Sequence, residues 1–78
     1  MIRGRVIGRL WSSKNIETIP GGALLEVEAD GGGKIVALDV IGCAEGEAVL
    51  VTQGSVAASH FPNARAPIDA LIIGSIDE

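Results

Sequence analysis

The sequence is poor in several residue types, and each scarcity narrows the functions it can serve. It contains one cysteine, no tyrosine, and single copies of tryptophan and phenylalanine, Trp11 and Phe61. A lone cysteine, Cys43, cannot form an internal disulfide, which agrees with a reducing compartment. The near absence of aromatics removes the platform on which single-stranded nucleic acids usually stack. A net charge of −4 also opposes general nucleic-acid binding.

Long hydrophobic runs are missing as well. No window approaches the roughly 18 consecutive apolar residues that a membrane-spanning helix needs. Met1–Leu10 is interrupted by arginines and lacks the apolar core of a signal peptide. We therefore expect a cytosolic protein with no membrane segment.

The sequence is nevertheless rich in apolar residues for its length. Its 78 residues predict one domain, 1–78, and a chain this short buries only about 60% of its unfolded surface. Yet 47% of the residues are hydrophobic, and the mean hydropathy is +0.42. Such a surplus predicts burial against other copies of the chain or against a partner. The apolar run Ala66–Glu78, APIDALIIGSIDE, predicts a strand covered by the core on one face and by a neighbouring subunit on the other.

Apolar and polar residues mostly alternate with a period of two, and glycine-rich turns interrupt the alternation, which is typical of an all-β protein. The predicted strands are Ile2–Trp11, Ala23–Ala29, Lys34–Val40, Ala48–Thr52 and Asp69–Ile76. The predicted connections are a loop at Ser12–Gly22, a tight hairpin turn at Asp30–Gly33 and a turn at Ile41–Glu47.

One short helix is predicted between the fourth and fifth strands. Ser55 is placed to cap this helix, whose body is Val56–His60, and Pro62 stops it. Five short strands with one helix predict a small five-stranded barrel of the oligonucleotide-binding (OB) kind. The glycines predicted to serve the backbone conformation, rather than to bind a ligand, are Gly42, Gly46 and Gly74.

A hydrolase site is one hypothesis for the polar residues near this helix, namely Ser55, Ser59, His60 and Asp69. A catalytic triad needs a base held against its nucleophile, a third group that orients the base, and an oxyanion hole. Here the single histidine lies at the end of a one-turn helix, and no nucleophile-elbow sequence surrounds either serine. We therefore interpret His60 as a solvated residue and predict no catalytic residue.

A metal site is also weakly indicated. Cys43 and His60 supply two ligands where a zinc site usually has four, so we interpret Cys43 as a small buried or interface hydrophobe. Asp39 and Asp69 each lie beside a turn, where aspartate commonly accepts hydrogen bonds from backbone N–H groups. Both are interpreted as structural, and the sequence predicts neither a metal ion nor a cofactor.

Three arginines, Arg3, Arg5 and Arg9, fall on the predicted outer face of the first strand. One hypothesis places them in a nucleic-acid groove on an OB-type barrel. The other pairs them with Glu26 and Glu28 of the neighbouring strand, or with acidic groups of another subunit. The acidic composition and the scarce aromatics favour the second hypothesis. An OB-type nucleic-acid-binding module is the alternative function.

Four motifs follow one another along the chain: LWSSK at 10–14, VALDVIGCAEGEAVLV at 36–51, GSVA at 54–57 and APIDALIIGSID at 66–77. In order and spacing they resemble the vertex proteins of bacterial microcompartments, a family that includes the ethanolamine-utilisation N protein and the carboxysome L shell protein. The chain departs from the family pattern at Ala44 and Val56, where glycine and serine are usual, and at Ser59 or its neighbour, where arginine is common. The matching positions after the first motif are Ala37, Asp39, Gly42, Gly46, Glu47, Val49, Leu50, Gly54, Ser55, Ala57, Ala66, Pro67, Asp69, Ala70, Gly74 and Asp77.

The resemblance implies an OB-like barrel that assembles into a ring at the fivefold corners of a polyhedral protein shell in the cytoplasm. The ring is usually a pentamer, and the sequence does not distinguish a pentamer from a hexamer. The resemblance also implies a structural protein, not an enzyme, whose partners are its own copies and the hexameric proteins of the flat facets. A small metabolic enzyme with His60 in its site is the third hypothesis. The loop residues that we expect on the rim of the ring are Ser13, Lys14, Asn15, Asn63 and Arg65.

Overall fold

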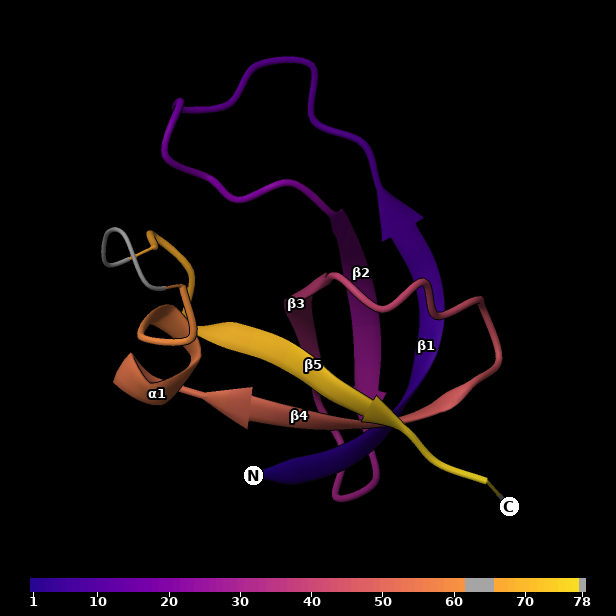
Figure 1. Cartoon of the computed structure of the whole chain (residues 1–78). Helices are drawn as coiled ribbons and strands as arrows, with labels where there is room; N and C mark the ends of the chain where they lie inside the picture. The colour runs from indigo at the N-terminus through magenta and orange to yellow at the C-terminus, as the bar shows by residue number, and fades with distance from the viewer. Residues whose placement is uncertain (62–65, 78) are drawn as a thin grey trace.

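The strands of the chain close into a five-stranded barrel (Figure 1). The computed structural model describes residues 1–61 and 66–77. Around the barrel the strands follow the order β1, β2, β3, β5, β4, and β4 pairs with β1 to close it. The β3–β5 pair is parallel and the other four pairs are antiparallel. The elements are β1 (Ile2–Leu10), β2 (Ala23–Ala29), β3 (Lys34–Asp39), β4 (Ala48–Gln53), α1 (Ser55–Ala58) and β5 (Ala70–Ser75).

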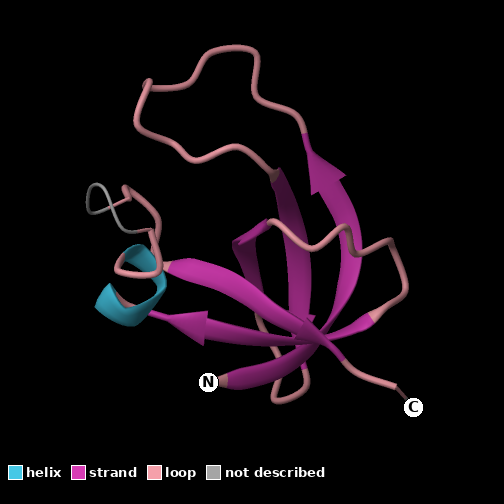
Figure 2. Ribbon diagram, in the orientation of Figure 1, coloured by secondary structure: helices cyan, strands magenta, loops and turns pink. Residues whose placement is uncertain are grey.

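The predicted all-β barrel with a single short helix is confirmed (Figure 2). Each predicted strand agrees with an observed strand to within one residue at either end. The segments expected as connections lie between these strands as loops and turns. The described part of the chain contains no helix that is long and apolar enough to cross a membrane.

The alternation of residues explains how β2 and β3 form a hairpin. Leu25 and Val27 point into the barrel, where they are 3% and 0% exposed. The chain then turns back tightly, and Gly33 adopts a φ of +83°, a conformation that glycine reaches at little cost. The Ala29 N–H donates to the Gly33 carbonyl over 3.0 Å and closes the hairpin.

β1 departs from strict alternation. Its pairing with β2 shifts between Val6 and Gly8, so Ile7 is an extra residue in a β-bulge. Beyond the bulge Arg9 pairs with Leu25, whose side chain is buried in the barrel. Directly opposed residues of an antiparallel pair share a face of the sheet. The prediction that all three arginines of β1 share one outer face is therefore wrong, because Arg9 follows the bulge.

The two longest strands approach each other closely at Gly4. A Cβ atom at this position would lie 2.6 Å from the Glu28 carbonyl oxygen and 2.6 Å from Val27 Cγ1. Any side chain there would force β1 away from β2, so the residue must be glycine. The close contact accompanies the strong curvature of β1 in Figure 1.

The glycine predictions have two outcomes. Gly42 and Gly46 have φ values of +99° and +92°, so both serve turn conformations that other residues rarely adopt. Gly74 has no positive φ, and a Cβ atom there would meet nothing within 4 Å. The prediction that Gly74 is required by the backbone is therefore wrong.

Buried side chains form two clusters. A small one on the outer side of the barrel joins Leu38 of β3 and Leu71 of β5 to Ala57 of α1. A larger one fills the barrel and consists of Val6, Leu25, Val27, Ala37, Val49, Val51, Ala70 and Ile72. The outer cluster explains why a four-residue helix is stable, because packing rather than propensity holds it.

The outer face of β5 is covered in a different way from the one expected. Leu71 is 2% exposed because the chain's own α1 and β3 cover it. A neighbouring subunit is thus not needed at Leu71, and that part of the expectation is wrong. Ile73, two residues further on, is 43% exposed, so its coverage by a neighbouring subunit stays a prediction.

The N-cap of α1 is Gly54, not Ser55 as predicted. Gly54 has a φ of +77°, and its N–H donates to the Asp69 carbonyl over 2.7 Å. This bond ties the start of the helix to the start of β5 and leaves Ser55 as the first helical residue. The helix ends at Ala58, two residues before the predicted end, and the predicted stop at Pro62 lies outside the described residues.

Candidate assembly surface

The residues considered for a hydrolase site have other partners. The Ser59 hydroxyl donates to the Val56 carbonyl of its own helix over 3.0 Å. The His60 ring lies edge-on to Phe61, with 4.9 Å between ring centroids. Neither contact supplies a base held against a nucleophile, which is the first requirement of a triad.

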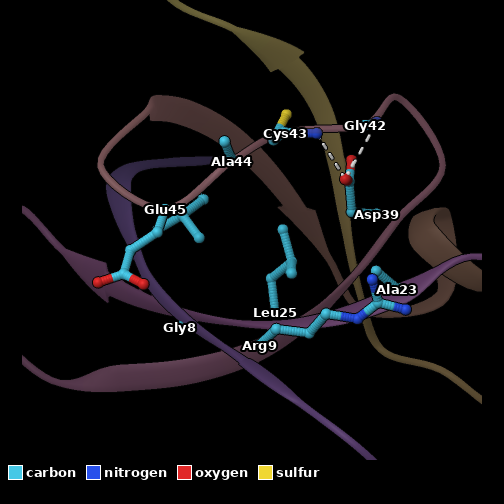
Figure 3. Close-up of a pocket in the computed structure, with 10 residues that line it drawn as sticks. Gly8, Arg9, Ala23, Leu25, Asp39, Gly42, Cys43, Ala44 and Glu45 are labelled. Atoms are coloured by element: carbon cyan, nitrogen blue, oxygen red, sulfur yellow. Dashed lines mark hydrogen bonds between the residues drawn. The ribbon is translucent and has the colours of Figure 1, made fainter.

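Asp39 holds the turn after β3 through its carboxylate. Its side chain is buried at the end of β3, and the residue is 3% exposed. Its carboxylate accepts hydrogen bonds from the backbone N–H groups of Ile41 at 3.1 Å, Gly42 at 3.1 Å and Cys43 at 2.8 Å (Figure 3 shows the last two). The interpretation of Asp39 as a structural turn acceptor is confirmed. The Asp69 carbonyl accepts the Gly54 N–H, and a role for the Asp69 carboxylate stays a prediction.

Cys43 lies half-buried in the same turn and packs against the barrel core. Burial, and to a lesser extent the negative charges of Asp39 and Glu47, raise the pKa of its thiol to about 11. The thiol therefore stays protonated at neutral pH, whereas nucleophiles and metal ligands are thiolates. Within residues 1–61 and 66–77, no three His, Cys, Asp or Glu side chains are grouped to hold a metal ion.

A cavity of about 350 Å³ opens beside this turn at the end of the barrel. Figure 3 shows Arg9 and Leu25 on one side of it, with Cys43 and Glu45 on the other. Its charged groups have opposite signs and come from different elements. The cavity therefore offers no single type of charge that would select a ligand.

The three arginines of β1 are dispersed instead of forming a groove. Arg3 forms an exposed ion pair with Asp30 at 3.3 Å. Arg5 donates to the Gly46 carbonyl over 2.7 Å. The Arg9 guanidinium lies 3.8 Å from the centroid of the Trp11 ring. They do not share the continuous basic face that an OB-type nucleic-acid groove requires.

Large apolar side chains are exposed over much of the described chain. Two of them, Trp11 and Ile16, lie on the segment 11–22, which extends away from the barrel in Figure 1 and whose residues 11–18 are all exposed. Trp11 is 79% exposed there. Among residues 1–61 and 66–77, the exposed large apolar residues are Met1, Leu10, Trp11, Ile16, Val36, Val40, Ile41, Val56 and Ile73. These exposed side chains are the surplus of apolar surface that the sequence predicts for a chain that binds other chains.

The family comparison decides which class of protein this surface serves. The family model described as "Ethanolamine utilisation protein EutN/carboxysome" matches residues 1–77. The chain belongs to this family. Among curated proteins, the "Bacterial microcompartment shell vertex protein GrpN" of Rhodospirillum rubrum is 33% identical over 84 residues, covering 99% of this chain and 93% of GrpN.

Solved structures agree with the family assignment. A pentameric shell protein of the RMM microcompartment is 56% identical, with a TM-score of 0.95, over 99% of this chain and 91% of the other. CcmL of Gloeobacter violaceus is 32% identical, with a TM-score of 0.82, over 99% and 86%. This member of the EutN/CcmL family is therefore a structural protein of a bacterial microcompartment shell in the cytoplasm, and not an enzyme. The nucleic-acid alternative receives no support from these relatives.

Two parts of the surface were not identified from the sequence. Val40 was predicted as the last residue of a strand, yet it begins a turn in which Val40 and Ile41 are both exposed. The signal was present as two β-branched apolar residues between an aspartate and a glycine. The stacking of Arg9 on Trp11 was also missed, although residues two positions apart in an extended segment lie on the same face.

Proposed function

We propose that five copies of this chain form a ring that occupies the fivefold corners of a microcompartment shell. The observation that carries the proposal is the exposure of nine large apolar side chains among the described residues of this small barrel. Relatives that match over 91–94% of their own length, and whose names describe pentameric shell proteins and a shell vertex protein, support the same assembly. A ring buries apolar surface that a single chain leaves in water.

The fivefold position follows from the geometry of closed shells. A sheet of sixfold units is flat, so a closed polyhedron requires fivefold units at its corners. The proposed partners are therefore the hexameric proteins of the facets, which meet the rim of the ring. Each contact is small on a chain of this size, so binding strength comes from several subunits that engage neighbours at once.

The proposed rim includes the exposed tip of the segment 11–22. Ser13, Lys14 and Asn15 all lie there and are exposed. The Ser12 hydroxyl donates to the Lys14 carbonyl over 2.9 Å and gives the tip a local turn. Asn63 and Arg65, also predicted for the rim, lie outside the described residues.

The proposal is tested in two steps. Native mass spectrometry of the chain alone should give one species of about 40 kDa, five times 8.0 kDa. A mass of six chains would replace the pentamer with a hexamer. The facet proteins are then expressed with and without this chain and imaged. We expect open or elongated shells without it and closed polyhedra when it is added back. Shells that close equally well in the absence of this chain and of every paralogue would contradict the vertex role.

A further inference from the structure

The turn after β3 presents two apolar side chains to solvent on a rigid support. Val40 and Ile41 are 47% and 52% exposed. Beneath them the buried Asp39 carboxylate accepts three backbone N–H groups of residues 41–43, at 2.8–3.1 Å. A carboxylate held by several donors in a buried position fixes one backbone conformation. The turn is therefore well ordered although its apolar side chains have no cover.

The same turn is supported from its other side by the end of the segment 11–22. A Cβ atom at Gly22 would lie 2.5 Å from the Asp39 carbonyl oxygen and 3.3 Å from Val40 Cγ1. The backbone of Gly22 thus packs directly against the turn. Apolar groups that are already held in place lose little conformational freedom when they dock, which favours binding.

A groove lies beside the turn. It measures about 390 Å³, and Arg9 and Asp39 are the ionisable groups among its described lining residues. The other lining residues are glycine, alanine, valine and isoleucine, so the groove continues the apolar surface of the turn.

The area that a ring needs points to a second copy of this chain as the occupant of this surface. A standard interface takes about 800 Å² from each partner, and a subunit in a ring contacts two neighbours. Two such contacts would take roughly a third of the 4947 Å² that the single chain exposes. An interface that large must include exposed apolar residues. Val40 and Ile41 form an adjacent exposed pair that also lines the groove.

We infer that the Val40–Ile41 turn and the groove beside it form a surface on which a second copy of this chain docks. The inference rests on the proposed ring and specifies one of its contact surfaces. A photo-crosslinking amino acid placed at position 41 of the full chain tests it directly. The matched control carries the same crosslinker at position 56, because Val56 is 66% exposed on α1.

Irradiation should produce covalent dimers from position 41 in several-fold excess over position 56. Equal yields at the two positions would overturn the inference while the ring itself stands. The experiment is repeated with the facet proteins present. Crosslinks from position 41 to a facet protein, without crosslinks to a second copy, would also overturn it. If the unmodified chain is a single chain by native mass, the proposed ring fails first, and this outcome is distinguishable from the other two.

A double variant supplies the second measurement. Val40→Ser with Ile41→Ser should shift the native mass from about 40 kDa to 8.0 kDa, whereas Val56→Ser should leave the ring intact. Circular dichroism establishes whether each variant is folded. A folded double variant that remains a ring contradicts the inference. If the double variant does not fold, the crosslinking yields decide.

Discussion

Asp39 illustrates how single polar residues in this chain stabilise a backbone conformation. A buried carboxylate is costly unless hydrogen bonds compensate it, and here three amides of one turn do so. The backbone N–H of Cys43 is one of these three donors, and the thiol of Cys43, in the same turn, stays protonated at neutral pH. These residues resemble a reactive pair by type, but the geometry uses them to hold the backbone.

The first prediction concerns Asp39→Asn. An amide side chain has one acceptor oxygen instead of two, and it places an NH₂ group against backbone donors. We expect the free energy of unfolding to fall by about 1–3 kcal/mol, because at least one buried N–H group loses its partner. Urea unfolding followed by circular dichroism measures the change. Asp77→Asn is the control because Asp77 is exposed, and an equal effect of both changes would contradict the role of Asp39.

The second prediction concerns the pH dependence of Cys43. Its pKa is about 11 in the folded chain, above the ordinary value of 9.0, so between these values the folded state binds more protons than the unfolded state. The stability that Cys43 contributes is thus complete below pH 9.0 and is lost as the pH rises toward 11. The folded chain should be alkylated at pH 8 about tenfold or more slowly than the chain in denaturant. Similar rates in the two states would show that the thiol is not protected.

β1 shows how far an element follows from its sequence. The alternation in IRGRVIGRL predicts a strand, and it correctly predicts Val6 inside and Arg3 outside. It does not predict the bulge at Ile7, because a bulge depends on the register with β2 and not on a residue type. The predicted N-cap of the helix was wrong for a similar reason. Both Gly54 and Ser55 are acceptable N-caps, and the long-range bond from Gly54 to β5 decides between them.

The third prediction compares two glycines of β1. Gly4→Ala should destabilise the fold by about 1–3 kcal/mol, because the new Cβ atom meets the β2 backbone and forces the strands apart. Gly8→Ala is a matched control in the same strand, where a Cβ atom would meet nothing within 4 Å. It should be neutral or slightly stabilising, since alanine restricts the unfolded chain. Thermal unfolding measures both. Equal stability of the two variants would show that β1 and β2 do not approach closely at Gly4.

On the scale of the whole molecule, this barrel has a small interior and an apolar exterior. Eight buried residues fill the barrel, while nine large apolar side chains remain exposed among the described residues. Composition alone indicated assembly, and the order of the motifs indicated the family. The Val40–Ile41 turn was not predicted, because the period-two pattern placed Val40 at the end of a strand. The exposure of both residues depends on how Asp39 and Gly22 fold around the turn.

The last prediction follows from coupling between assembly and folding. If a ring unfolds to separate chains, its melting temperature depends on total concentration by mass action, however tightly the subunits bind. Dilution over about two decades should therefore lower the melting temperature of the parent chain. The Val40→Ser and Ile41→Ser double variant, once dissociated, should melt lower and show no such dependence. A reversible melt of the parent that is unchanged by dilution would mean that subunit contacts contribute nothing to the stability of the barrel. The apolar exterior would then need a function other than joining copies of this chain.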